Sequence, residues 1–204
     1  EVPILDGSAF DFAHAIKSFG IKEQNDPRKF IKVLKKVEVN NGVKKISIEP
    51  LSKDLVIDFE IVYNNPLIRT RRKEFKLSKS DLNPITDSRT FCLYEDIDKI
   101  RSQGLAKGGS LENAIVVKDQ KILNDDGLRY RDEFVNHKIL DCIGDLMLSG
   151  HRIFGYIKTS QGGHQLTNAL LREFFSDESN WEFENFEDKD DKHGKYSKSI
   201  AVNA

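Results

Sequence analysis

The spacing of apolar residues divides this chain into strand-like and helix-like segments. Alternating or β-branched apolar residues predict strands over 2–5, 30–39, 43–49, 55–63, 75–77, 90–94, 114–118, 121–123 and 152–158, with Trp181, Phe183 and Phe186 in a last strand. Helical spacing predicts helices over 9–19, 95–103, 132–150 and 164–175, and residues 78–82 are expected to open a short one. The order of these segments predicts an α+β fold with several antiparallel hairpins and a few helices on one face.

The two ends of the chain differ from its middle. The strand and helix expected over residues 2–19, with Gly20 as the helix end, form a unit too small for a domain. We expect them to be the end of a domain that begins earlier, because the chain starts at Glu1 and not at Met. The polar segment 21–28 indicates a linker, and the charged residues 187–204 indicate a flexible tail.

The helix expected over 132–150 carries the strongest chemical signal. His137 and Asp141 are four residues apart and therefore share one face of it, with Asp145 on the same narrow polar stripe and Lys138 at its edge. Neutral imidazole and carboxylate are both ordinary zinc ligands. The same stripe could equally be the solvent face of an amphipathic helix, since a short metal-ligand spacing also occurs by chance.

His164 is a second candidate, because it follows Gly162-Gly163 and begins a helix. A histidine in this position is either an ordinary first residue of a helix or a proton donor held by a carboxylate. Asp145 is the candidate partner, since it lies two turns from His137 on the polar stripe.

Composition limits the class of protein. The formal net charge of −1 gives no bulk attraction for nucleic acid. No apolar run approaches the roughly 20 residues of a membrane span, and no secretory signal is visible. Cys92 and Cys142 form neither a disulfide framework nor a C-x-x-C metal site, and this cysteine usage suits a reducing cytoplasm. The basic cluster over 69–73 indicates a solvated strand or loop, or else a phosphate contact.

Six ordered segments together resemble a known family. They are V-P-I-L-D-G-S at 2–8, S-R-T-F at 88–91, G-L-A-K-G-G-S-L-E-N-A-I-V-V at 104–117, L-N-D-D-G-L-R at 123–129, the helix segment 132–146 and G-G-H-Q-L-T-N at 162–168. This pattern resembles the zinc-dependent UDP-3-O-acyl-N-acetylglucosamine deacetylases of Gram-negative lipid A biosynthesis, from Glu1 to about Phe175.

The resemblance implies two similar α+β domains, each a two-layer sandwich, that face each other across the active site. Residues 1–24 would end the first domain, and residues 29–186 would form the second. Within the second domain, residues 93–117 would be an inserted β-α-α-β unit that forms a hydrophobic passage for the acyl chain.

The resemblance also implies a role for each site residue. His137 and Asp141 would be two of three protein ligands to zinc, and Lys138 would reach the polar head of the substrate. His164, oriented by Asp145, would protonate the leaving amine, and Thr90 would hydrogen-bond the oxyanion. The residues that would contact the substrate, a UDP-linked acylated glucosamine, are Tyr63, Phe91, Ile97, Gly109, Ser110, Ala114 and Val116, with Tyr63 against the uridine.

The family's third zinc ligand and general-base Glu belong to a Glu-His motif that does not occur in these 204 residues. We therefore expect this chain alone to bind zinc weakly and not to turn over. One alternative is a non-catalytic binding or interaction module, and another is a different metal-dependent hydrolase on a similar layout. No obligate protein partner is evident from the sequence.

Overall fold

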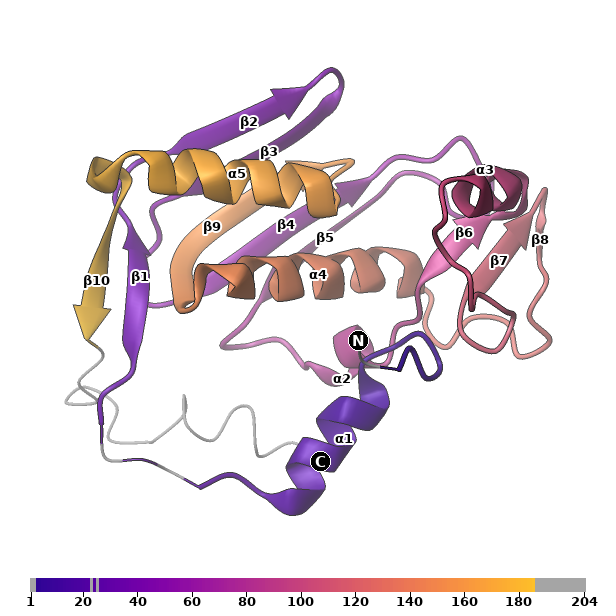
Figure 1. Ribbon diagram of the computed structural model, residues 1–204, viewed down its shortest axis with the longest axis horizontal. Helices are drawn as coiled ribbons and strands as arrows, with labels where there is room; N and C mark the ends of the chain where they lie inside the picture. Colours follow the sequence, from indigo (N-terminus) through magenta and orange to yellow (C-terminus); the bar gives the residue numbers. More distant parts are fainter. Residues whose placement is uncertain (1–2, 23, 25, 186–204) are drawn as a thin grey trace.

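A mixed β-sheet covered on one face by two helices forms the centre of the protein (Figure 1). The computed structural model describes residues 3–22, 24 and 26–185. The sheet contains β1 (Lys29–Val33), β2 (Val37–Asn41), β3 (Lys44–Glu49), β4 (Leu55–Ile61), β5 (Arg71–Lys76), β9 (Arg152–Ser160) and β10 (Trp181–Asn185). β9 organises the sheet, because it pairs in parallel with β1 and β4 and antiparallel with β3.

The helices α4 (Glu133–Leu146) and α5 (His164–Ser176) lie side by side on this sheet (Figure 1). They bury the β-branched residues of its inner face, so the core lies between the two layers. Ile46, Ile48, Ile57 and Ile157 are completely buried there. The short helices η2 (Met147–Ser149) and η3 (Glu178–Asn180) follow α4 and α5.

A smaller three-stranded sheet lies beyond the N-terminal end of α4 (Figure 1). It consists of β6 (Phe91–Leu93), β7 (Ile115–Lys118) and β8 (Lys121–Ile122), and the link between β6 and β7 contains η1 (Tyr94–Asp96) and α3 (Ile97–Ser102). We call residues 91–122 the insert. β6 and β7 are parallel, as a helical connection between neighbouring strands requires.

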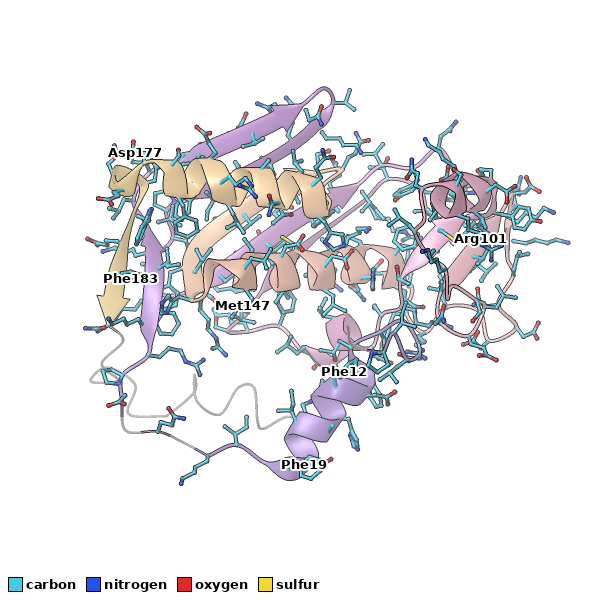
Figure 2. The ribbon with its side chains drawn as sticks, viewed as in Figure 1. Phe12, Phe19, Arg101, Met147, Asp177 and Phe183 are labelled. Atoms are coloured by element: carbon cyan, nitrogen blue, oxygen red, sulfur yellow. The ribbon has the colours of Figure 1, made fainter. Side chains whose placement is uncertain are left out.

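The remaining helices, α1 (Phe10–Phe19) and α2 (Asn83–Thr86), lie below α4 in the view of Figure 1. α1 has no buried residue, and its apolar side chains Phe12, Ile16 and Phe19 are exposed. Figure 2 labels two of them, Phe12 and Phe19, along this helix.

The α+β prediction is confirmed, and most helices and strands occur within a few residues of their predicted bounds. Three local predictions are wrong. Residues 3–5 form no strand, since they enter a turn with Leu5 at φ 51° and have no neighbouring strand to pair with. The segment 30–39 is split by a break at 34–36, and the short helix begins at Asn83, next to Pro84, and not at residue 78.

The basic cluster over 69–73 leads into β5, where Arg72 is exposed as predicted for a solvated strand, and its side chains contact neighbouring groups of the protein. Arg72 pairs with the buried Asp58, Lys73 donates to Asn136, and Arg71 donates to the carbonyl of Ile68. Phe186 and the charged tail 187–204 lie outside the described residues. Within the part of the chain that is described, no helix has the length and apolar character needed to cross a membrane.

Candidate active site

His137 lies in the second turn of α4 and is buried, with 8% of its surface exposed. Its Nδ1 is 3.0 Å from the carbonyl oxygen of Ser88. A carbonyl can only accept, so Nδ1 carries the proton and donates it, which leaves the lone pair of a neutral ring on Nε2. Burial lowers the pKa of His137, which favours this neutral form.

Asp141 stands one turn further along α4 and faces the same side. Its Oδ1 is 3.3 Å from Nε2 of His137, and its Oδ2 accepts a hydrogen bond of 2.9 Å from Nζ of Lys138. Burial raises the pKa of Asp141, but the neighbouring His137 and Lys138 outweigh this effect and leave the pKa below its ordinary value. Asp141 is therefore an anion that faces an imidazole nitrogen.

Nε2 of His137 and Oδ1 of Asp141 are arranged in a way that fits a divalent cation. With the proton of His137 held at Nδ1, an imidazole lone pair and a carboxylate oxygen face each other with no hydrogen between them, which is unfavourable without a cation. Nitrogen and oxygen donors suit zinc, and the carbonyl contact at the second ring nitrogen is the usual support of a histidine ligand. Two ligands are fewer than a zinc site uses, and among the described residues no group of three candidate ligand side chains converges.

His164 begins α5 and meets the polar stripe of α4. Its Nδ1 lies 2.8 Å from Oδ1 and 2.9 Å from Oδ2 of Asp145, and its Nε2 lies 4.0 Å from Oδ1 of Asp141. The ring is exposed. The proton on Nδ1 is thus held by Asp145, while Nε2 is turned toward the His137–Asp141 pair.

Three predicted substrate contacts form a cluster beside this pair. Tyr63 packs edge-on against Phe91, with ring centroids 5.7 Å apart, and Nζ of Lys138 lies 5.7 Å from the centroid of Phe91. Burial raises the pKa of the Tyr63 phenol, so the hydroxyl stays protonated. The cluster provides an aromatic wall and an ammonium group next to Asp141.

Thr90 lies next to the same hollow as His137. Both residues line a hollow of about 350 Å³, which also borders Leu140 and the N-terminal residues Pro3, Ile4, Gly7, Ser8, Ala9 and Phe12. The backbone N–H of Thr90 donates to the carbonyl of Gly7, at 2.9 Å. Residues 3–12 therefore form one wall beside the candidate site.

The other predicted substrate residues lie in the insert: Ile97 on α3, Gly109 and Ser110 in the loop after it, and Ala114 and Val116 at β7. Ser110 is exposed and Val116 is 7% exposed. These residues are near the N-terminal end of α4 (Figure 1), but no described contact joins them to His137 or Asp141.

Comparison with known proteins now decides the family. The family model for UDP-3-O-acyl N-acetylglycosamine deacetylase matches residues 1–176. The chain belongs to this family. One relative named UDP-3-O-acyl-N-acetylglucosamine deacetylase, from Actinobacillus pleuropneumoniae serotype 3, is 45% identical over 93% of this chain and 63% of its own length. Another with this name, from Pseudoalteromonas translucida, is 43% identical over 92% of this chain and 62% of its own length. The relative in Hahella chejuensis is 44% identical over 98% of this chain and 67% of its own length. The chain thus spans about two thirds of the length of these deacetylases.

Sequence reasoning missed a buried ion pair that supports the candidate site. Glu133 is completely buried one turn before His137, and its Oε1 accepts from both the backbone N–H and Nε of Arg89, at 3.1 and 2.9 Å. Its Oε2 accepts from the backbone N–H of Arg129 at 2.6 Å. The Glu133 carboxylate therefore holds the loops that carry Arg89 and Arg129 against the start of α4.

This ion pair fixes the segment on which His137 depends. Arg89 is 3% exposed and lies between Ser88, whose carbonyl holds His137, and Thr90. Its guanidinium also binds Asp126 and the carbonyl of Gly127, both at 2.7 Å. The available sequence signal was an acidic residue four positions before His137 in a mostly apolar helix, where a carboxylate needs a partner.

Proposed function

We propose that this chain contributes to the zinc-dependent removal of the N-acetyl group from a UDP-3-O-acyl-N-acetylglucosamine, a step of lipid A biosynthesis. The observation that carries the proposal is the placement of His137 Nε2, whose lone pair faces the Asp141 carboxylate at 3.3 Å. The family match and the names of the relatives support the reaction class. Cys92 and Cys142 are free thiols, which is consistent with our proposal that the protein is located in the reducing cytoplasm.

His137 and Asp141 would hold the zinc ion, with the proton of His137 kept on Nδ1 by Ser88. Zinc bound there would lower the pKa of its water and polarise the acetamide carbonyl. Lys138 neutralises part of the charge of Asp141 through its contact with Oδ2. Its ammonium group is also placed to reach an anionic or hydroxyl-rich part of the substrate.

His164 would give the proton to the leaving amine from Nε2. The contact of Asp145 with Nδ1 holds the ring in one orientation, so Nε2 stays turned toward the metal pair. Thr90 would donate a hydrogen bond from its hydroxyl to the oxygen on which negative charge develops. Thr90 shares a hollow with His137, and His164 Nε2 lies 4.0 Å from Oδ1 of Asp141, so both groups are near the pair at which the amide would bind.

We assign the polar head of the substrate to Tyr63, Phe91 and Lys138, and its acyl chain to the insert, with Ile97, Gly109, Ser110, Ala114 and Val116 along the passage. The aromatic wall offers a flat apolar surface to a base or sugar ring. We further propose that residues 29–186 form a second domain and that residues 1–24 end a first one.

The proposal is tested by acetate release from a UDP-3-O-acyl-N-acetylglucosamine by the full-length protein. We expect activity that is lost after chelation and restored by zinc. Zinc-independent activity would overturn the metal assignment. Substrate binding without any hydrolysis, at full zinc content, would favour a non-catalytic module.

A second measurement concerns the 204-residue chain alone. A tetrahedral zinc site in a hydrolase has three protein ligands, and the described residues offer two. We expect this chain to bind zinc more weakly than the full-length protein and to show no turnover. Robust hydrolysis by the isolated chain would contradict this expectation.

A further inference from the structure

A cavity at the other end of α4 has no role in the proposed reaction. Its volume is about 230 Å³, and Leu146, Met147, Phe30, Phe154 and Leu82 contribute to its apolar wall. Figure 2 labels Met147 near the C-terminal end of α4 and Arg101 in the insert near the opposite end. The cavity is therefore separate from both the insert and the His137–Asp141 pair.

Arg152, the first residue of β9, lines this cavity and is only partly exposed. No hydrogen bond or ion pair of its guanidinium is found within the described part of the chain. Burial and the nearby positive charge of Arg28 both lower the pKa of Arg152. A partly buried guanidinium without a carboxylate is unusual, because removing a charge from water is costly unless it is paired.

The acidic residue of the cavity is already engaged elsewhere. Asp54 is 5% exposed, and its carboxylate accepts from the backbone N–H groups of Leu55 and Ser78 and from the hydroxyl of Ser78, at 2.9, 3.2 and 2.6 Å. Nζ of Lys76 lies 3.7 Å from its Oδ2. The negative charge of Asp54 is therefore compensated by its own partners. The positive charge of Arg152 then gives the cavity a net positive charge.

We propose that this cavity binds a short-chain amphipathic carboxylate, with its acyl chain on the apolar wall and its carboxylate on Arg152. Each part of the site selects one part of the ligand. The guanidinium fork matches a carboxylate in two parallel hydrogen bonds, and the apolar wall gains free energy with each methylene that leaves water. A small inorganic anion would not use the wall, and a neutral chain would leave Arg152 unpaired.

The test is calorimetric titration of the full-length protein with octanoate, together with the ¹³C shift of its labelled carboxylate. We expect saturable binding, with octan-1-ol binding at least roughly tenfold more weakly and acetate not saturating, since a charge-assisted hydrogen bond is worth about tenfold or more in affinity. The variant R152M should lower the affinity for octanoate by a similar factor. The matched control R172M, which removes an exposed arginine of α5, should not change it.

A second variant keeps the test independent of the charge change. M147W places a larger side chain in the cavity at a residue that is 50% exposed and therefore tolerates the change. This variant should also lower the affinity for octanoate. Unchanged affinity in R152M and M147W would overturn the proposal, as would the absence of saturable binding. Octanoate binding that is lost in S110W, and kept in R152M, would place the ligand in the insert instead. Acetate release in R152M should equal that of the wild type, so this proposal and the proposed function fail separately.

Discussion

His164 Nδ1 lies 2.8 Å from Oδ1 of Asp145, and this contact joins the first residue of α5 to the polar stripe of α4. The helices pack against each other over the same sheet, so the ring and the carboxylate are held from two rigid elements. The contact uses one ring nitrogen and leaves Nε2 turned toward the candidate zinc ligands. The two helices thus hold the His164 ring in a fixed position relative to the His137–Asp141 pair.

Replacing His164 with alanine should reduce the turnover of the full-length protein by a factor of roughly 10²–10⁴, the usual contribution of a general acid. The zinc content should stay near the wild-type value, because the ring is exposed and is not one of the paired ligands. Steady-state acetate release and metal analysis of the same sample check both parts. The D145N variant should lower turnover less, since it disturbs the ring without removing it. Full turnover in H164A would show that the proton comes from another group.

Replacing Glu133 with glutamine should destabilise the protein by about 3–5 kcal/mol, because it leaves the buried Arg89 guanidinium without its carboxylate. Zinc affinity should fall by roughly 10–100-fold, the usual effect of disturbing the support of a metal ligand. Urea unfolding and zinc titration measure the two effects. The matched control is D126N, which removes the other carboxylate partner of Arg89. The Asp126 side chain is 62% exposed, so its loss should cost at most about 1 kcal/mol. Equal losses in E133Q and D126N would contradict the assigned role of Glu133.

Neighbouring glycines before His164 should respond differently to alanine. A Cβ at Gly162 would collide with Oγ1 of Thr159 and would lie 3.2 Å from Cζ of Phe59, whereas a Cβ at Gly163 would meet nothing within 4 Å. Gly163 has an extended φ of 175°, which any residue adopts. We expect G162A to destabilise the protein by about 1–3 kcal/mol, the usual effect of overpacking, and G163A to be nearly neutral. Thermal unfolding of the two variants provides the comparison, and equal stability would show that the turn adjusts freely.

Protonation of Asp58 should lower the stability of the folded protein at acidic pH. Its carboxylate is 3% exposed, and its contacts with Arg72, followed by that with Tyr156, hold the pKa of Asp58 below its ordinary value of 3.8. A group with a lower pKa in the folded state stabilises it above the unfolded pKa and loses this contribution as the pH falls through the folded pKa. The wild type should therefore lose more stability than D58N between pH 5 and pH 2. Urea midpoints across this range measure the difference, and parallel curves would exclude Asp58 as the cause.

The local parts of the fold could be predicted from the sequence, and the non-local parts could not. The apolar spacing of α4 and α5 is a property of each segment, so both helices and the shared face of His137 and Asp141 were predictable. The parallel pairing of β9 with β1 and β4 joins segments about a hundred residues apart, and no short-range pattern encodes it. The expected strand at residues 2–5 failed for the same reason, because a strand needs a partner.

The candidate site shows the same division. The spacing predicted which groups share a helix face, and the pairing of His164 with Asp145 is present in the structure. The Ser88 carbonyl that fixes the tautomer of His137, and the Arg89–Glu133 pair behind it, depend on loops that fold against α4. Their roles in catalysis stay predictions until the variants are measured.

Zinc content per chain, measured after dialysis against metal-free buffer, tests the central claim most directly. The full-length protein should retain about one zinc ion, while H137A and D141A should each bind zinc at least roughly tenfold more weakly and H164A should keep the wild-type content. Full zinc occupancy in both H137A and D141A would contradict the account, because the metal would then be held elsewhere.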